Sequence, residues 1–143
     1  MPRVDFYVLA EGAPDARFKY ACRLAEEFVS RGGRLYLQTA NATDTRRVDD
    51  LLWTCSDGSF LPHEIFTGAE ASHARVMILI GESLAPASHR DLLINLTKTI
   101  PPNIEDYERI AEIVEADPER KRTARDRYKQ YRERGCALES HNV

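Results

Sequence analysis

The sequence predicts an α/β fold of three layers, in which a mainly parallel sheet is flanked by helices. Short apolar runs rich in β-branched and aromatic residues alternate with longer segments whose apolar residues recur every three or four positions. The segments between successive runs are also long enough for the crossover connections that parallel strands require. All 143 residues are expected to form one domain, because a chain of this length can bury one core and no linker or repeat divides it.

The order of strands and helices follows from these patterns. Residues 4–9 (VDFYVL) are almost all apolar, as in a strand that is covered on both faces. Residues 13–31 carry one apolar stripe at helical spacing and are followed by two glycines that end the helix. The same reasoning places strands at residues 4–9, 34–39, 75–81 and 91–96, helices at residues 13–31, 41–55, 104–116 and 118–134, and a short strand at the end of the loop 56–66. This alternation is typical of a Rossmann-like sheet, and the last helix in it is strongly basic.

Composition narrows the classes of protein to which the chain can belong. The net charge is −3 and the isoelectric point is about 5.8, values that are unusual for a DNA-binding domain. The three cysteines lie far apart and form no CxxC motif, which argues against a disulfide framework or a zinc site. No apolar run approaches the ~20 residues of a membrane span, and the first residues do not resemble a signal peptide. We therefore expect a cytoplasmic protein that makes no contact with a membrane.

The sequence contains no recognisable motif for catalysis or for cofactor binding. The loop after the first strand (AEGAPDAR) has a single glycine, and the chain lacks GxGxxG, GxxxxGK[ST] and GxSxG. The four histidines are scattered along the chain. We therefore expect no catalytic residue, no cofactor and no metal. The alternative is a small nucleotide-binding domain or enzyme that uses the crevice at the strand ends, because catalytic groups need only meet in space.

The only tryptophan of the chain is expected at the surface of its helix. Val48, Leu51 and Leu52 recur at the spacing of a buried stripe. Trp53 lies roughly 140° around the helix from Val48, at ~100° per residue, and Phe60 follows in the short loop SFLPH. Trp53 and Phe60 either pack together under this loop, or they form an exposed patch that binds another protein.

Positive charge is concentrated near the C-terminus of the chain. Residues 119–135 (ERKRTARDRYKQYRERG) hold eight Lys or Arg and three acids, a charge of +5, whereas the other residues together carry −8. On a helix, Lys121, Arg125 and Lys129 share one face. The aromatic side chain of Tyr128 lies beside them. This segment is therefore expected to form a basic helix with an aromatic edge.

Three interpretations of the basic helix remain open. It can be a solvated face with internal ion pairs, such as Asp126 with Arg122. It can bind nucleic acid through basic and aromatic side chains, although the acidic remainder of the chain opposes a phosphate backbone. It can also bind an acidic peptide or a C-terminal carboxylate, with cations on the carboxylates and an aromatic-edged pocket for an apolar side chain. Val114 is expected near the junction of this helix with the preceding one.

Five stretches of the sequence carry a family resemblance through their order and spacing. They are RVDFYVL at the start, VDDLLW, SFLPH, RDLLINL and RDRYKQYRERG near the end. With these stretches the chain resembles, over nearly its whole length, the chi subunit of bacterial DNA polymerase III. The resemblance implies a non-catalytic accessory protein of the clamp-loader complex in DNA replication. Such a protein pairs with the psi subunit and binds the acidic C-terminal tail of single-stranded DNA-binding protein, so that it meets DNA only indirectly.

The resemblance also implies roles for particular residues. The contact with the psi subunit corresponds to Trp53 and Phe60. The tail of single-stranded DNA-binding protein ends in an apolar residue with a free carboxylate. The residues that correspond to the contact with this tail are Lys121, Arg125, Tyr128, Lys129 and Val114.

Overall fold

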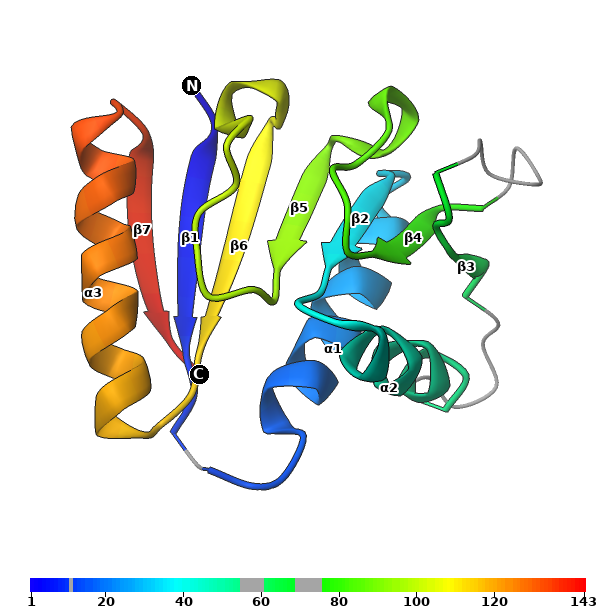
Figure 1. Ribbon diagram of the computed structural model, residues 1–143, viewed down its shortest axis with the longest axis horizontal. Helices are drawn as coiled ribbons and strands as arrows, with labels where there is room; N and C mark the ends of the chain where they lie inside the picture. The colour runs from blue at the N-terminus through cyan, green and yellow to red at the C-terminus, as the bar shows by residue number, and fades with distance from the viewer. Residues whose placement is uncertain (11, 55–60, 69–75) are drawn as a thin grey trace.

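The computed structural model describes residues 1–10, 12–54, 61–68 and 76–143. Its centre is a sheet of seven strands in the order β3-β4-β2-β5-β6-β1-β7 (Figure 1). These strands are β1 (Arg3–Val8), β2 (Leu35–Gln38), β3 (His63–Ile65), β4 (Ile78–Gly81), β5 (Leu92–Asn95), β6 (Arg109–Val114) and β7 (Ala137–Asn142). Each neighbouring pair of them is parallel, as the long connections in the sequence predict.

The α-helices of the described residues complete the three layers that the sequence predicts. α1 (Ala16–Ser30) and α2 (Ala42–Leu52) pack on one face of the sheet, over β2, β4 and β5. α3 (Pro118–Glu133) packs on the opposite face, over β1, β6 and β7, and Figure 1 shows it beside β7. Two single turns of 3-10 helix, η1 (Ala87–His89) and η2 (Ile104–Asp106), lie in the connections. None of the helices in the described part of the chain has the length and apolar character of a membrane span.

The helix ends follow the local sequence. Asn41 caps α2 by accepting a hydrogen bond of 2.9 Å from the backbone N–H of Asp44, as asparagine commonly does at the start of a helix. Pro118 lies in the first turn of α3. Asp117, directly before it, accepts a hydrogen bond from the backbone N–H of Arg120 at 3.1 Å. These contacts fix the start of α3 directly after β6.

The prediction of a helix at residues 104–116 is wrong. These residues form η2 and then β6, so that Val114 lies at the end of a strand and not on a helix. The three- and four-residue spacing of apolar side chains favoured a helix. However, β6 is buried on both faces, and a strand in that position has no clear alternation of apolar and polar residues.

The strand β7 has no counterpart among the elements expected from the sequence. It pairs with β1 along its whole length, from Ala137 opposite Arg3 to Asn142 opposite Val8. Most of its side chains are polar and at least partly exposed, as is common for a strand at the edge of a sheet. The last residues of the chain therefore complete the sheet beside α3.

A buried polar network joins β6 to α3. The carboxylate of Glu112 is fully buried and accepts hydrogen bonds from the hydroxyl of Tyr131 at 2.6 Å and from Nδ2 of Asn95 at 2.8 Å. It also accepts a hydrogen bond of 3.1 Å from Nε of Arg127. Burial raises the pKa of the Glu112 carboxyl, and the charge of Arg127 opposes this shift only in part. Because two of the partners lie on α3, the network sets the rotation of α3 about its axis.

Candidate protein-binding site

The basic helix α3 borders a hollow over the edge of the sheet. The hollow has a volume of about 310 Å³ and is formed by α3 together with β1, β6 and β7. Its lining residues are Phe6, Val8, Val114, Lys121, Ala124, Arg125, Tyr128 and Ser140. Four of the five residues for which the resemblance implies a contact with the tail therefore meet at one place.

The floor of the hollow is apolar and partly aromatic. Val114 ends β6 and is 4% exposed, because it is packed beneath α3. The ring of Tyr128 on α3 lies 5.3 Å from the ring of Phe6 on β1, tilted by 54°. Such ring pairs are favourable and restrict the orientation of both side chains. The floor can therefore bury an apolar group against a wall that is held in place.

Two cationic side chains stand at the rim of the hollow. Lys121 and Arg125 are exposed and lie one turn apart on α3. Among the described residues, no acidic side chain lies within ion-pair distance of either of them. Arg122 forms its ion pair with Glu119 at 2.5 Å, and not with Asp126. Cations without an acidic partner beside an apolar floor suit a ligand that combines a carboxylate with an apolar side chain.

Lys129 lies on the same basic helix but outside the hollow. It is exposed one turn beyond Arg125, and it is not among the residues that line the hollow. The basic surface of α3 therefore continues past the hollow. Lys129 can contact only a ligand that extends beyond it.

Trp53 is exposed, as its position relative to the buried stripe of α2 predicts. It caps the C-terminal end of α2 and is 58% exposed, whereas Val48 and Leu52 are almost fully buried. Its ring meets the imidazole of His63 on β3 edge-to-face, with 4.6 Å between the ring centroids. The Nδ1 of His63 in turn bonds to the carbonyl oxygen of Leu61 at 2.6 Å. An exposed indole on a fixed support has the character of an interface anchor.

The two candidate contact regions lie at opposite edges of the sheet. β3, which carries His63 beside Trp53, is the first strand in the sheet order, and β7, which lines the hollow, is the last. Figure 1 shows α2 and α3 at correspondingly distant places. Phe60, the other residue that corresponds to the psi contact, lies outside the described residues. The separation leaves room for two partners to bind at the same time.

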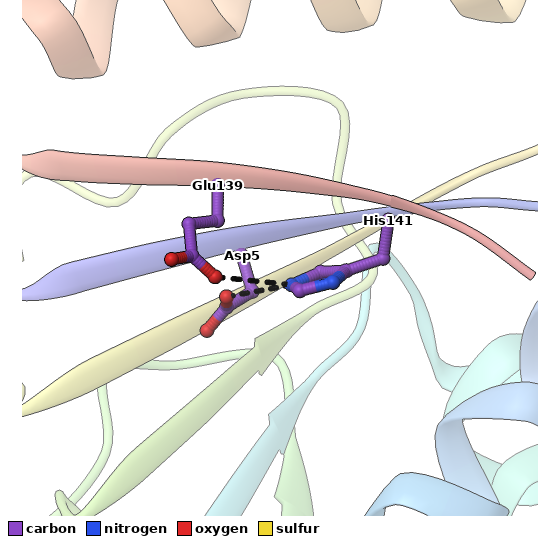
Figure 2. A group of neighbouring side chains, drawn as sticks. All are labelled: Asp5, Glu139 and His141. Atoms are coloured by element: carbon purple, nitrogen blue, oxygen red, sulfur yellow. Dashed lines mark hydrogen bonds and ion pairs between the residues drawn. The ribbon is translucent and has the colours of Figure 1, made fainter.

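A charged cluster lies on the face of β1 and β7 that points away from α3 (Figure 2). Asp5, Glu139 and His141 each bring one potential ligand atom within 4.8 Å of the others, a spacing that can suit a metal ion. However, Arg109 and Arg3 donate hydrogen bonds to the carboxylate of Asp5 at 3.1 and 3.2 Å. These two guanidinium groups already neutralise the carboxylate. The cluster is therefore better suited to joining β7 to β1 than to holding a cation.

The charge of Asp5 makes the stability of this region depend on pH. Burial by itself would raise the pKa of Asp5, but hydrogen bonds from His141 and from two arginines outweigh burial and lower it. A carboxyl whose pKa is lower in the folded state stabilises the fold above the unfolded pKa, which is ~3.9. This contribution is lost as the pH falls through ~3.9 towards the lower folded pKa.

Replacing Asp5 with asparagine is expected to lower the free energy of unfolding by about 1–3 kcal/mol at neutral pH, because the paired arginines lose a charged partner. Near pH ~3 the loss should be smaller, because the carboxyl is then largely protonated in the unfolded chain and folding has to ionise it. Urea unfolding at the two pH values measures the difference. The control is Glu139→Gln at the exposed neighbour, which should lower the free energy of unfolding by less than ~1 kcal/mol. An Asp5→Asn loss that does not change with pH would contradict this account.

Comparison with known sequences decides which family this chain represents. The family model described as "DNA polymerase III chi subunit, HolC" matches residues 1–139. The chain belongs to the DNA polymerase III chi subunit family. A DNA polymerase III subunit chi of Pseudomonas aeruginosa is 39% identical over 143 residues, covering 100% of this chain and 98% of the relative. Relatives of the same name from Haemophilus influenzae and Escherichia coli are 29% and 28% identical, and cover 97% and 96% of this chain and 96% of each relative.

Membership of the chi family makes this chain a replication accessory subunit of DNA polymerase III, and it confirms the resemblance seen in the sequence. The sequence did not point to three residues of the hollow, namely Phe6, Val8 and Ser140. The first two occupy alternate positions of β1 that face α3, so strand alternation could have indicated them. Ser140 belongs to the unexpected strand β7 and had no comparable signal.

Proposed function

We propose that this chi-family subunit links the psi subunit, and through it the clamp loader, to the acidic C-terminal tail of single-stranded DNA-binding protein during DNA replication. It would act in the cytoplasm as a non-catalytic subunit that needs no cofactor. The observation that carries the proposal is the hollow beside α3, where two cations that have no acidic partner among the described residues border an apolar floor. A peptide that ends in an apolar residue with a free carboxylate matches both features.

In this proposal the last residue of the tail matches the apolar floor and the cationic rim of the hollow. The terminal apolar side chain enters the hollow and packs against Val114 and Tyr128. The terminal carboxylate meets Arg125 and Lys121 at the rim, where charge-assisted hydrogen bonds form. Lys129 faces acidic residues of the tail that lie further from its end.

The acidic remainder of the chain does not oppose this contact. The net charge of the whole chain is −3, whereas residues 119–135 carry +5. Charges further away than the Debye length, about 8 Å at physiological ionic strength, are largely screened. A short peptide held against α3 is therefore attracted mainly by the cations next to it.

Replacing Arg125 with alanine is expected to weaken binding of the tail peptide roughly tenfold to a hundredfold. The reason is the loss of a charge-assisted hydrogen bond, which contributes about 1.5–3 kcal/mol. Isothermal titration calorimetry with a synthetic peptide of the tail measures the change. The affinity should also fall as the salt concentration rises, because part of the attraction is between ions.

Arg122 offers a matched control on the same helix. It is an exposed arginine that pairs with Glu119 and does not line the hollow. Arg122→Ala removes the same charge and should change the affinity for the peptide less than about threefold. If Arg122→Ala and Arg125→Ala lose the same affinity for the peptide, general electrostatic attraction and not the hollow accounts for binding. An unchanged affinity in Arg125→Ala would refute the proposal that the tail peptide binds in the hollow.

The psi subunit is proposed to bind at the other edge of the sheet, around Trp53 and Phe60. Support for this part comes from the exposure of Trp53 and from its contact with His63. Large aromatic side chains that are exposed in the free protein often carry most of the energy of an interface. The separation of Trp53 from the hollow predicts that variants at one site leave the other partner bound.

A further inference from the structure

A second cavity lies on the other flank of α3, where β5 and β6 end. It has a volume of about 320 Å³ and is lined by the start of α1, the end of β5 and the segment after it, the end of β6, and α3 as far as Arg127. It shares only Val114 with the hollow beside β7. In open parallel sheets, ligands bind in crevices beyond the carboxyl ends of the strands. This cavity has that position, and the proposed function makes no use of it.

Two arginines in the wall of this cavity are held in fixed positions. The side chain of Arg17 is 18% exposed, and its Nε lies 2.9 Å from Oε1 of Glu115. Its Nη1 donates a hydrogen bond of 2.8 Å to the backbone carbonyl of Leu96. The side chain of Arg127 is 10% exposed and is held by the buried carboxylate of Glu112. Guanidinium groups that are ordered in advance lose little conformational freedom when a ligand binds.

The cavity carries an excess of positive charge. Its charged lining consists of four cations and two carboxylates, namely Arg17, Lys98, Arg120 and Arg127 against Glu115 and Glu119. Burial lowers the pKa of Arg17, Glu115 opposes this only in part, and the nearby charge of Arg120 adds to the lowering. Arg17 and Arg120 therefore repel each other, and an anion between them would offset the repulsion.

We propose that this cavity binds the phosphate group of a small phosphorylated ligand. A phosphate monoester carries about −1.5 to −2 charges near neutral pH, which matches the excess of two positive charges in the lining. The exposed guanidinium of Arg120 presents forked N–H donors that fit phosphate oxygens, and the Nη2 groups of Arg17 and Arg127 add donors beyond those bonded to internal acceptors. The volume lies at the lower end of the ~300–1,000 Å³ that is usual for small-molecule sites. Because the chain lacks glycine-rich loops, side chains and not backbone amides would hold the phosphate.

Calorimetric titration of the full chain with inorganic phosphate, pyrophosphate, ADP and adenosine, at constant ionic strength, tests this proposal. Phosphate-bearing probes should bind saturably, and adenosine should give no heat. Arg120→Gln and Lys98→Gln should each weaken phosphate binding at least about tenfold, because each removes a cation from the lining. Arg132→Gln, which removes an exposed charge from α3 outside the cavity, should leave phosphate binding unchanged. ADP that binds more tightly than phosphate would identify a nucleotide as the source, and equal binding would identify phosphate itself.

Two results would overturn the proposal. The first is the absence of saturable binding with phosphate, pyrophosphate and ADP up to ~10 mM, which would mean that the cavity has no useful affinity. The second is an equal loss in Arg132→Gln, which would assign the effect to the general charge of α3. NMR signals of the Nε–H groups of Arg17 and Arg127 provide a local readout and should shift when phosphate is added. Arg120→Gln should keep its affinity for the tail peptide, so the two proposals can fail separately.

Discussion

Replacing Arg127 with alanine is expected to lower the free energy of unfolding by about 3–5 kcal/mol. The side chain of Arg127 is 10% exposed and lies 3.1 Å from the carboxylate of Glu112, which is itself 1% exposed. Without the arginine, Glu112 keeps its hydrogen bonds from Tyr131 and Asn95 but loses the only cation beside it in this buried network. A buried charge without a partner is costly, and that cost is the expected loss.

Chemical unfolding followed by circular dichroism measures this loss, and two further variants separate its causes. Arg125→Ala, on the same helix but exposed, should change stability by less than about 0.5 kcal/mol. Adding Glu112→Gln to Arg127→Ala should restore part of the loss, because the amide keeps a hydrogen-bonding role without a charge. No recovery in the double variant would mean that lost packing, and not charge, dominates.

The loss in Arg127→Ala should also depend on pH. Burial already raises the pKa of Glu112, and removal of the neighbouring cation raises it further. An acid whose pKa is raised in the folded state destabilises the fold as the pH rises from the unfolded value, ~4.3, towards the folded one. The loss is therefore expected to be smaller near pH ~5 than near pH ~8. The opposite trend would exclude Glu112 as the source.

Replacing Trp53 with alanine is expected to remove stable binding of the psi subunit, with a loss of about 2–4 kcal/mol or roughly thirtyfold to several hundredfold in affinity. The indole is 58% exposed in the free protein, so its removal leaves no cavity in the core. The loss should therefore appear in binding and hardly in stability. Co-purification of the two subunits and calorimetric titration measure it.

Leu84 provides a matched control for Trp53. It is another large apolar side chain at the surface, 45% exposed, and lies between β4 and η1. Leu84→Ala should leave binding of the psi subunit unchanged. Trp53→Ala should retain its affinity for the tail peptide, because the hollow lies at the opposite edge of the sheet. Loss of both partners in Trp53→Ala would show that the two regions are coupled or that the fold is damaged.

The layered architecture could be predicted from the sequence because most elements obey simple periodicities. Buried strands such as β1 and β2 are nearly continuous apolar runs, and α1 and α2 carry clear stripes. The error at residues 104–116 arose where a tertiary interaction overrides local preference. A glutamate in the middle of a buried strand is stable only when its carboxylate has hydrogen-bond partners, and Glu112 has three. They are Arg127, Tyr131 and Asn95. No local sequence pattern indicates these partners, which lie 15 to 19 residues away from Glu112 in the chain.

In the candidate sites, too, some residues could be predicted from local spacing and others could not. Trp53 and the basic face of α3 could be found from helical angles alone, since exposure on a helix follows directly from spacing. Val114 came from family resemblance and was placed on the wrong element, although it does line the hollow. Ser140 depends on the pairing of β7 with β1, which joins residues at opposite ends of the chain. Such long-range pairing is not encoded in any local pattern.

The position of β7 has a consequence for synthesis of the protein. Among the described strands, β1 leaves the ribosome first, and β7, which covers its outer edge, leaves last. A nascent chain therefore exposes the unsatisfied backbone groups of β1 until β7 has emerged, and it cannot complete the hollow before then. Fusion tags or truncations that disturb the final residues should thus impair both assembly of the sheet and capture of the partner's tail.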